Sequence, residues 1–345
     1  CLLPWTLRYE DVELRAAEMG IVGTAEAYRR RGLVRHLNER FSQLMQEGGY
    51  VLSHIQGIGF FYRQFGYDYA IPQNVDWRIE PYLVPAAPAD VAYEFRPATP
   101  EDIGLLARWY DAATATLGIS TVRDVDIWRY MLGTSTGTAL AAETWVVESR
   151  GTPLGYLRIN QHGFGTGLIV GEVSRLPADA ALATLAWLKT IADERNKPYI
   201  ELNLHCDASL LTVARAYGAH EAGTYAWQVR VPDPAAFIRT IAPVLERRVA
   251  RSIFAGTTRR FTLNAYGESI ELMWENGRLV HVQPVTTGAR ADLWLLPQLV
   301  GPLMLGYRSL DELRSAYPDV GAGAEARMFA DVLWPRMSSF LYTQY

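Results

Sequence analysis

Four arginines surround one glycine in the segment VGTAEAYRRRGLVRHLNERF. Three of them, from Arg29 to Arg31, precede Gly32, and Arg35 follows it where an apolar pattern typical of a helix begins. The first N–H groups of a helix attract anions, guanidinium groups bind phosphate oxygens, and a glycine lets a phosphate approach the backbone closely. The pattern predicts a phosphate site; the alternative is a solvated basic face at a helix start.

The composition makes this cluster a local feature. The chain of 345 residues has a net charge of −4, so the arginines are not part of a basic surface for nucleic acid, and we expect a small anion as partner. With 49% hydrophobic residues, the chain can fill the cores of two or three domains. Its two cysteines and six histidines show no disulfide framework and no metal-ligand spacing, so no metal is expected.

No stretch of the sequence predicts a membrane segment. No apolar run reaches the roughly 20 residues that a membrane helix needs, and no signal segment opens the chain. We therefore expect a cytoplasmic protein that does not bind membranes. The chain begins at Cys1 in strand-like sequence, which suggests that some residues precede it.

The arginine turn lies within an alternating order of strands and helices. The segment CLLPWTLRY and residues 11–24 read as a strand hairpin, and a helix follows Gly32. Next come a strand at 50–55, a short helix at 60–66, and a further strand from Tyr67. The turn is therefore predicted to connect the end of a strand to the start of a helix.

Two segments together carry a resemblance to a known family. VGTAEAYRRRGLVRHL, followed by FFYRQFGYDYA, resembles the acyl-CoA motif of the GNAT N-acetyltransferases, and the variant RRRGL with YRQFGY is similar to the enhanced intracellular survival (Eis-type) branch. The general motif RxxGxG has glycine or alanine where this chain has Val34, but a larger aliphatic residue is common in that branch.

The resemblance implies an acetyl-CoA-dependent N-acetyltransferase that acts by direct transfer. Tyr62 would protonate the departing thiolate, and the α-carboxylate of Tyr345 would be the base. The alternative for Tyr62 is a purely structural role in packing against the neighbouring aromatic residues, and the alternative for Tyr345 is a chain end that is packed but not catalytic. The implied acceptors are amines such as aminoglycosides, polyamines or lysines, and the implied assembly is a hexamer. The residues expected to hold the cofactor are Val22, Gly23, Thr24, Arg30, Arg31, Gly32, Leu33, Val34, Arg35, Gly57 and Ile58.

The chain also contains an internal comparison. After the proline-rich stretch PYLVPAAPAD, similar elements recur. In an alignment of the two copies, YRQFGY corresponds to ARAYGA, so the position of Tyr62 is taken by Ala214 in the second copy. The arginine turn aligns with GEVSRLPADAAL, which has no glycine at the turn. We therefore expect the second copy to lack a cofactor site.

These observations predict an α/β fold of three parts. The first is a GNAT domain at 1–85 that lacks its beginning, and the second is a degenerate GNAT-like domain at 91–231. The third, at 235–345, resembles a sterol-carrier-like α+β domain. Two other function classes remain open: a non-catalytic acyl-CoA-binding protein, which would tolerate loss of Tyr62, and a nucleic-acid-binding module, which the negative net charge disfavours.

Histidines near these motifs carry less weight. His36 and His54 flank the predicted site in sequence, but an isolated histidine beside apolar residues is more often a structural group. His205 beside Cys206 could form a thiol and base pair, but adjacent strand residues point to opposite faces.

Overall fold

The computed structural model describes residues 1–87, 92–138, 140–163, 165–286 and 291–343. These residues group into two compact units that each combine separate stretches of the chain. The first unit contains Cys1–Ile71, Leu117–Val122 and Ala226–Ser339, and the second contains the described residues of Pro72–Thr116, of Arg123–Tyr225 and after Ser339. In the part of the chain that is described, no helix is both long enough and apolar enough to cross a membrane.

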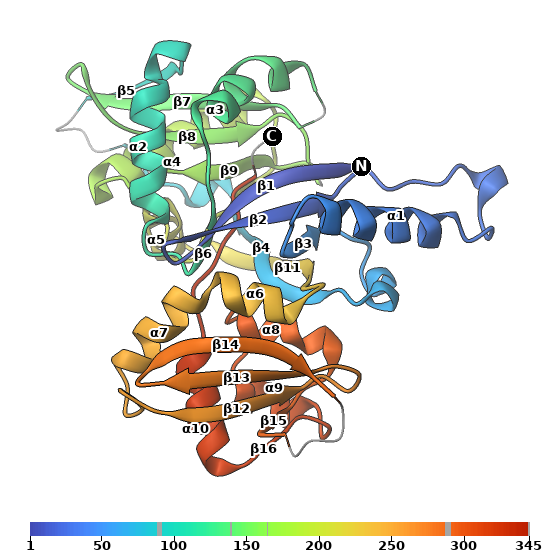
Figure 1. Cartoon of the computed structure of the whole chain (residues 1–345). Helices are drawn as coiled ribbons and strands as arrows, with labels where there is room; N and C mark the ends of the chain where they lie inside the picture. Colours follow the sequence, from blue (N-terminus) through green and yellow to red (C-terminus); the bar gives the residue numbers. More distant parts are fainter. Residues whose placement is uncertain (88–91, 139, 164, 287–290, 344–345) are drawn as a thin grey trace. The chain divides into compact units, whose positions relative to one another are not determined.

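The first unit begins with a hairpin that continues into a crossover (Figure 1). Strands β1 (Leu2–Tyr9) and β2 (Val12–Met19) pair antiparallel along their whole length, and β3 (Leu52–Ile55) then pairs parallel to β2. Helix α1 (Leu33–Glu47) makes the crossover between the two parallel strands, as such a connection requires. The strand order of this sheet is β11–β3–β2–β1–β6, where β6 is Ile119–Thr121 and β11 is His220–Arg230.

Helix α1 forms where the apolar spacing predicted it. Asn38, Phe41 and Met45 form its buried face, Gly32 holds a left-handed φ of 74° at its start, and Gly48 ends it. Two short 3-10 helices lie before and after it in the chain, η1 (Glu26–Tyr28) and η2 (Phe61–Phe65), and strand β4 (Asp68–Ile79) follows η2.

One strand ends earlier than the sequence predicted. The strand expected to reach Thr24 ends at Met19, which pairs with Leu2 at the start of β1. On the other side, the ladder with β3 ends at the pair of Glu18 and His54. Gly20 still exchanges backbone hydrogen bonds with Cys1, but among the described residues no strand includes residues 20–24.

The first unit also contains a five-stranded sheet with order β14–β13–β12–β15–β16. Helices α6 (Pro234–Thr240) and α7 (Ala242–Ala250) lie along β14 (Figure 1). The rings of Phe261, Trp274 and Phe329 meet in its core. The remaining elements are β12 (Arg259–Asn264), β13 (Ser269–Glu275), β14 (Arg278–Val285), β15 (Leu293–Trp294), η6 (Pro297–Leu299), α8 (Val300–Met304), α9 (Leu310–Ala316), β16 (Gly321–Ala322) and α10 (Ala324–Leu333).

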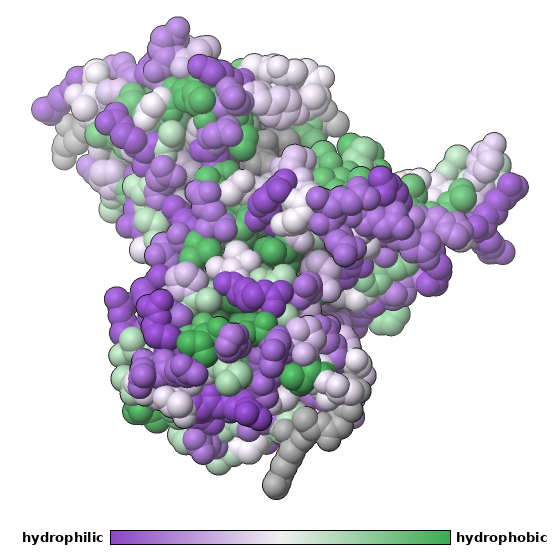
Figure 2. All heavy atoms as spheres, viewed as in Figure 1, coloured by the Kyte–Doolittle hydropathy of each residue, from purple (hydrophilic) through white to green (hydrophobic). Residues whose placement is uncertain are grey.

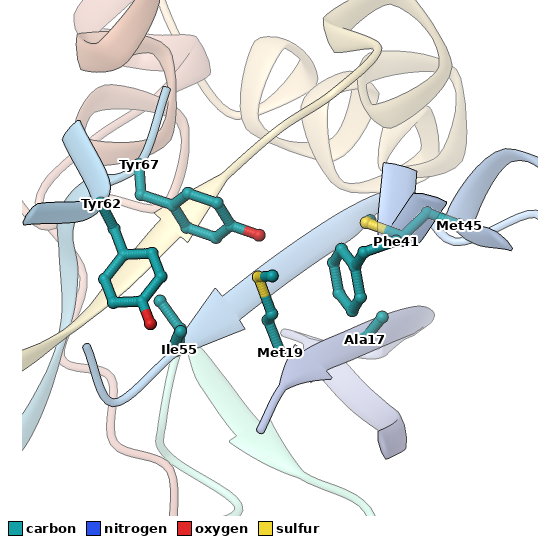
Figure 3. Packing of buried hydrophobic residues seen from close by; sticks show 7 residues of the cluster. All are labelled: Ala17, Met19, Phe41, Met45, Ile55, Tyr62 and Tyr67. Atoms are coloured by element: carbon teal, nitrogen blue, oxygen red, sulfur yellow. The ribbon is translucent and has the colours of Figure 1, made fainter. Parts of the chain in front are cut away.

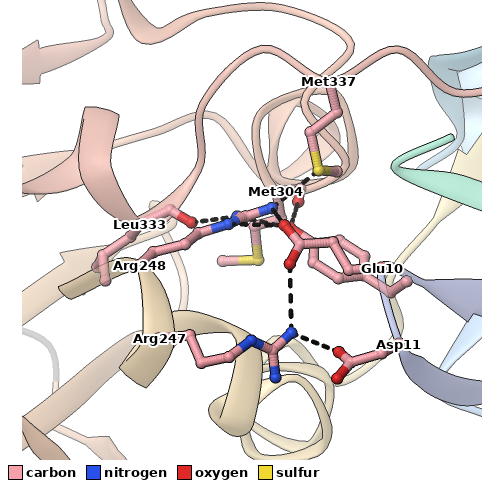
Figure 4. A network of polar contacts seen from close by, with 8 residues as sticks. Glu10, Asp11, Arg247, Arg248, Met304, Leu333 and Met337 are labelled. Atoms are coloured by element: carbon pink, nitrogen blue, oxygen red, sulfur yellow. Dashed lines mark hydrogen bonds and ion pairs between the residues drawn. The ribbon is translucent and has the colours of Figure 1, made fainter. Parts of the chain in front are cut away.

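A polar network connects the β1–β2 hairpin to helix α7 within the first unit (Figure 4). Arg248 donates to the Glu10 carboxylate at 2.6 Å and to the Leu333 carbonyl at 2.6 Å, and Arg247 bonds Asp11. The Tyr9 hydroxyl, also bonded by Arg248, donates to the Met304 carbonyl at 2.8 Å. Because these contacts hold the turn end of the hairpin, they fix the strand whose other end leads to the arginine turn.

The second unit is a mixed sheet with helices, in the order β5–β7–β8–β9–β10–β4. Its strands pair antiparallel except β9 and β10, which are parallel. The elements are η3 (Pro81–Leu83), β5 (Tyr93–Pro97), η4 (Pro100–Asp102), α2 (Ile103–Thr114), α3 (Val125–Leu132), η5 (Thr134–Gly137), β7 (Ala142–Ser149), β8 (Thr152–Asn160), β9 (Leu168–Val173), α4 (Ala178–Glu194), β10 (Ile200–Asn203) and α5 (Ser209–Ala216).

A buried ion pair lies in the core of the second unit. Arg123 binds both carboxylate oxygens of Glu172, at 2.8 and 2.6 Å, and both side chains are almost fully buried. Arg123 also donates to the Thr343 carbonyl at 2.5 Å and lies over the ring of Tyr110. Residues from Phe340 to Tyr342 are 5% exposed or less. The end of the described chain is therefore packed into this unit, although terminal residues usually fray.

Candidate functional site

The described predicted site residues lie on two loops, and on the first turns of the helices that follow them, at one end of two neighbouring strands. Strands β2 and β3 are parallel, so their carboxyl ends point the same way, and their ladder ends at Glu18 and His54. Residues 20–32 continue from one strand and 56–60 from the other. In open α/β sheets, ligands bind at the carboxyl ends of such strands.

The backbone of both loops is strained. Three residues other than glycine hold left-handed φ angles there: Ile21 at 51°, Arg30 at 61° and Phe60 at 70°. A left-handed conformation costs a side-chain-bearing residue about 1–2 kcal/mol, and most for a β-branched one such as Ile21. Strain of this kind gathers at ligand sites, where the surrounding structure maintains it.

Between the arginine turn and η2 lies a hollow of about 270 Å³. It brings together seven of the predicted cofactor residues with Arg29 of the same arginine cluster, and it adds four residues that were not predicted: Tyr28, Phe61, Gln64 and Phe65. The lining residues are Thr24, Tyr28, Phe61, Gln64, Phe65 and every residue from Arg29 to Arg35. Phe61 and Phe65 lie four residues apart in the sequence, on either side of Tyr62, and this spacing could have identified them as residues that line the hollow together.

The hollow is positively charged. In the part of the chain that is described, no carboxylate lies within ion-pair distance of Arg29, Arg30, Arg31 or Arg35. Helix α1 begins at the hollow and its N-cap, Gly32, supplies no side-chain hydrogen bond. The first N–H groups of the helix therefore add to the positive potential. Figure 2 shows hydrophilic residues across the surface of α1 and of the loop before it.

Tyr62 lies next to this hollow in a buried apolar cluster with Ile55, Met19 and Tyr67 (Figure 3). Its side chain is 4% exposed, and its ring centroid is 5.1 Å from that of Phe61 and 6.4 Å from that of Phe65. Burial raises the pKa of the Tyr62 phenol above its ordinary value of 10.0. The phenol is therefore protonated at neutral pH and can donate a proton, although the shift makes it a weaker acid.

The other predicted residues divide between the cluster and the surface. Val22 packs against the cluster that contains Tyr62, and Gly57 is buried beside the Tyr62 ring. Ile58 is 75% exposed, and no atom comes within 4 Å of the position where Gly23 would carry a Cβ. Tyr345 lies outside the described residues.

Gly57 and Gln228 form the support of Tyr62. A Cβ on Gly57 would lie 2.3 Å from Cδ2 of Tyr62 and 2.9 Å from Nε2 of Gln228. The Gln228 amide donates to the Gly57 carbonyl at 3.1 Å. Gln228 comes from β11, far along the chain, so only the tertiary structure identifies it.

We predict that Gly57→Ala moves the Tyr62 ring. A displacement of about 1 Å at a reacting group can cost about 10²-fold in rate, so kcat should fall by that order while the Kd of acetyl-CoA changes little. Turnover and calorimetric binding measure the two quantities. Gly104→Ala on α2 is the matched control, because its added Cβ meets no atom within 4 Å. Equal kcat for Gly57→Ala and the parent chain would contradict the support role.

His54 lies beside the site but cannot exchange protons there. It is fully buried between the rings of Trp5 and Trp227, whose centroids are 4.7 and 5.0 Å away. Neither ring nitrogen has a hydrogen-bond partner among the described residues. Burial lowers the pKa of His54 to about 3, so the imidazole is neutral at physiological pH. Its role is structural, and the exposed His36 only bonds Glu39.

Because His54 is buried between two tryptophan rings, we predict that acid lowers the stability of the fold. Its folded pKa of about 3 is below the ordinary 6.5, so the unfolded state binds the proton more readily. Stability should therefore fall by about 1.4 kcal/mol per pH unit as the pH drops below 6.5 towards 3. In denaturation between pH 7 and 4, His54→Phe should lose this component and the exposed His36→Gln should keep it. If the free energy of unfolding depended on pH equally in the parent chain, His54→Phe and His36→Gln, the burial of a neutral His54 would be contradicted.

Glu18 is an acidic residue that the sequence reasoning missed. It ends the ladder of β2 with β3 and is 4% exposed. An acid among the apolar residues Ala16, Ala17 and Met19 at the carboxyl end of the strand was the available signal. Because Glu18 is a buried carboxylate at the carboxyl end of β2, it is a second candidate for the base.

Comparisons with known proteins agree with this geometry. Residues 2–70 match the family model of the acetyltransferase (GNAT) domain, so the chain contains a GNAT acetyltransferase domain. No curated protein matches the chain.

Solved structures show the same fold along almost the whole chain. A GCN5-related N-acetyltransferase from Anabaena variabilis is 18% identical with a TM-score of 0.71, and the match covers 99% of this chain and 85% of that one. A probable N-acyltransferase from Enterococcus faecalis is 16% identical (TM-score 0.73, coverage 100% and 85%). Eis1 from Mycobacterium abscessus is 19% identical (TM-score 0.64, coverage 100% and 86%). The predicted mixed α/β fold is confirmed; the sterol-carrier-like part and the three-part division stay predictions.

Proposed function

We propose that the chain transfers acetyl from acetyl-CoA directly to a primary amine. The observation that carries this proposal is a hollow lined by arginines without carboxylate partners and by Phe61 and Phe65, whose rings pack against the buried ring of Tyr62. Anionic phosphates suit the hollow, and a proton donor next to its aromatic lining suits a thioester. The GNAT family match over residues 2–70 supports the same assignment.

The proposed reaction is one displacement with balanced proton transfers. The amine nitrogen forms a bond to the thioester carbonyl carbon, and the carbon–sulfur bond breaks. A base takes the surplus proton from nitrogen, and Tyr62 donates its proton towards the departing sulfur. A thiol is a stronger acid than a phenol, and burial raises the pKa of the Tyr62 phenol further, so full proton transfer from Tyr62 to the thiolate is uphill. Tyr62 therefore acts mainly by hydrogen bonding to the negative charge that develops on sulfur.

For the base we propose the α-carboxylate of Tyr345, as the resemblance to Eis-type enzymes implies. Glu18 is the second candidate, because it is a buried carboxylate at the strand end beside the site. Glu18→Gln and removal of Tyr345 separate the two: only loss of the true base should abolish the rise of kcat/KM with pH.

The acceptor class and the assembly stay predictions. We propose an aminoglycoside-like amine, a polyamine or a lysine as acceptor, and a hexameric assembly, on the resemblance alone. We propose a cytoplasmic location because the sequence predicts no membrane segment and no signal segment. The competing function is a non-catalytic acyl-CoA-binding protein, which would use the same arginine hollow.

The test is thiol release from acetyl-CoA by the full chain across a panel of amines. We expect turnover with at least one amine class and stoichiometric N-acetyl product by mass spectrometry. Tight binding of coenzyme A together with no turnover of any amine would establish the binding protein instead.

A further inference from the structure

The second unit has its own pair of parallel strands, and their carboxyl ends point the same way. Strands β9 and β10 pair as far as Val170 and Leu202. In the described chain these two strands pair no further, although β9 continues to Val173 and β10 to Asn203. In open α/β sheets, ligands bind in the crevice outside the carboxyl ends of the strands. The residues that follow β10 therefore lie where such a sheet holds a ligand.

Three residues with metal-binding side chains follow β10: His205, Cys206 and Asp207. The expectation that the first two side chains point to opposite faces is wrong, because β10 ends at Asn203 and the chain turns beyond it. Sγ of Cys206 lies 3.7 Å from Nε2 of His205 and 3.7 Å from Oδ1 of Asp207. One possible ligand atom from each residue lies within 4.8 Å of the other two. The turn therefore gathers a nitrogen, a sulfur and an oxygen donor.

The distances between these donor atoms are close to those of a tetrahedral zinc site. Zinc binds sulfur at about 2.3 Å and nitrogen or oxygen at about 2.0–2.2 Å, which places neighbouring ligand atoms about 3.3–3.6 Å apart. Cys206 is exposed and the Asp207 side chain is 79% exposed, so both can rotate by the small remaining difference. Thiolate and imidazole favour zinc, whereas magnesium and calcium take oxygen ligands. The donor set therefore fits zinc.

The surroundings of His205 prepare it as the fixed ligand. Its side chain is 12% exposed, its backbone N–H donates to the Tyr342 hydroxyl at 3.4 Å, and its ring lies 6.1 Å from that of Phe340. Burial lowers the pKa of His205 below its ordinary value of 6.5, so the ring is neutral at neutral pH, as metal binding requires. Binding through Nε2 places the ring proton on Nδ1. It therefore replaces only the 3.3 Å hydrogen bond that Nδ1 accepts from the Asp207 backbone.

We infer that His205, Cys206 and Asp207 form a zinc site in the second unit, with Nε2, Sγ and one carboxylate oxygen as ligands. The Cys206 thiol loses its proton to solvent when the metal binds. Three protein ligands on an exposed turn leave a fourth position for water or a further ligand, which is typical of zinc sites that are not purely structural. The sequence did not predict this site, because consecutive residues match no usual ligand spacing and only the turn brings their side chains together.

The experiment is titration of the reduced full chain with Co²⁺, followed by displacement with Zn²⁺. We expect one Co²⁺ per chain, a near-ultraviolet absorption band from thiolate-to-cobalt charge transfer, and loss of that band when Zn²⁺ is added. Cys206→Ser should abolish the band. Loss of a residue that only supports a ligand weakens metal binding by about 10- to 100-fold. Asp207→Asn should therefore raise the Kd of Zn²⁺ by at least about tenfold, measured by competition with a chromophoric chelator.

Cys1→Ser and Asp126→Asn are the matched controls. Cys1 is the other exposed cysteine, and Asp126 is an acid of the second unit with an 80% exposed side chain. Both variants should keep the band and the Kd of Zn²⁺. A parent chain without the band would overturn the inference, whatever the variants do. A band that persists in Cys206→Ser, or a millimolar Kd that none of the substitutions changes, would show adventitious binding only and would overturn it as well.

Discussion

Tyr62→Phe is expected to lower kcat by about 10²- to 10⁴-fold, the range that loss of a positioned proton donor covers. The Kd of acetyl-CoA should stay nearly constant, because the phenol lies in the inner cluster and not among the residues that line the hollow. The free energy of unfolding should change little, since the structure records no hydrogen bond from the Tyr62 hydroxyl to another described residue. Thiol release, calorimetry and chemical denaturation measure the three quantities.

Tyr50→Phe is the control for this prediction. Tyr50 packs at the margin of the same cluster, with Arg15 over its ring, and the substitution removes the same hydroxyl group from a place outside the hollow. It should leave kcat within about twofold. If Tyr62→Phe also kept its kcat, the phenol would be a packing group, and the proposal of a non-catalytic binding protein would gain support.

Arg123→Met is expected to give the largest loss of stability. It removes the cation that binds both carboxylate oxygens of the buried Glu172 and leaves Arg158, also buried, as the remaining positive charge beside it. Breaking one partner of a buried pair costs about 3–5 kcal/mol. Burial alone would raise the pKa of Glu172, but the charge and hydrogen bonds of Arg123 outweigh it and hold that pKa below 4.5. The pair therefore stabilises the fold above that pH and loses its effect as the pH falls through the lowered pKa. Urea denaturation at pH 7 measures the loss.

Two further variants make this test specific. Arg129→Met removes an arginine from the exposed pair with Asp126, whose side chains are 65% and 80% exposed, and should cost less than about 1 kcal/mol. The double variant Arg123→Met with Glu172→Met also removes the negative charge beside the buried Arg158, so it should regain little of the lost stability. A cost below about 1 kcal/mol for Arg123→Met alone would contradict the burial of the pair.

Much of the local structure followed from the sequence, because it depends on neighbouring residues. Gly32 and the spacing of Phe41 and Met45 placed helix α1, and the FFYRQF segment placed η2 around Tyr62. The arginines were recognisable as an anion site because their charge and the helix start are adjacent in the chain. The early end of β2 was not predictable in this way, since a strand lasts only as long as a neighbouring strand pairs with it.

The sequence by itself determined the chemical groups: the arginine turn, the glycine at the helix start and the tyrosine that follows the next strand. Only the tertiary structure decided what surrounds them. It set Gly57 and Gln228 behind Tyr62, caged His54 between two tryptophans and paired Arg123 with Glu172. The physical reason is that propensity and charge act between near neighbours along the chain, whereas burial and long-range contacts set the pKa and position of each group.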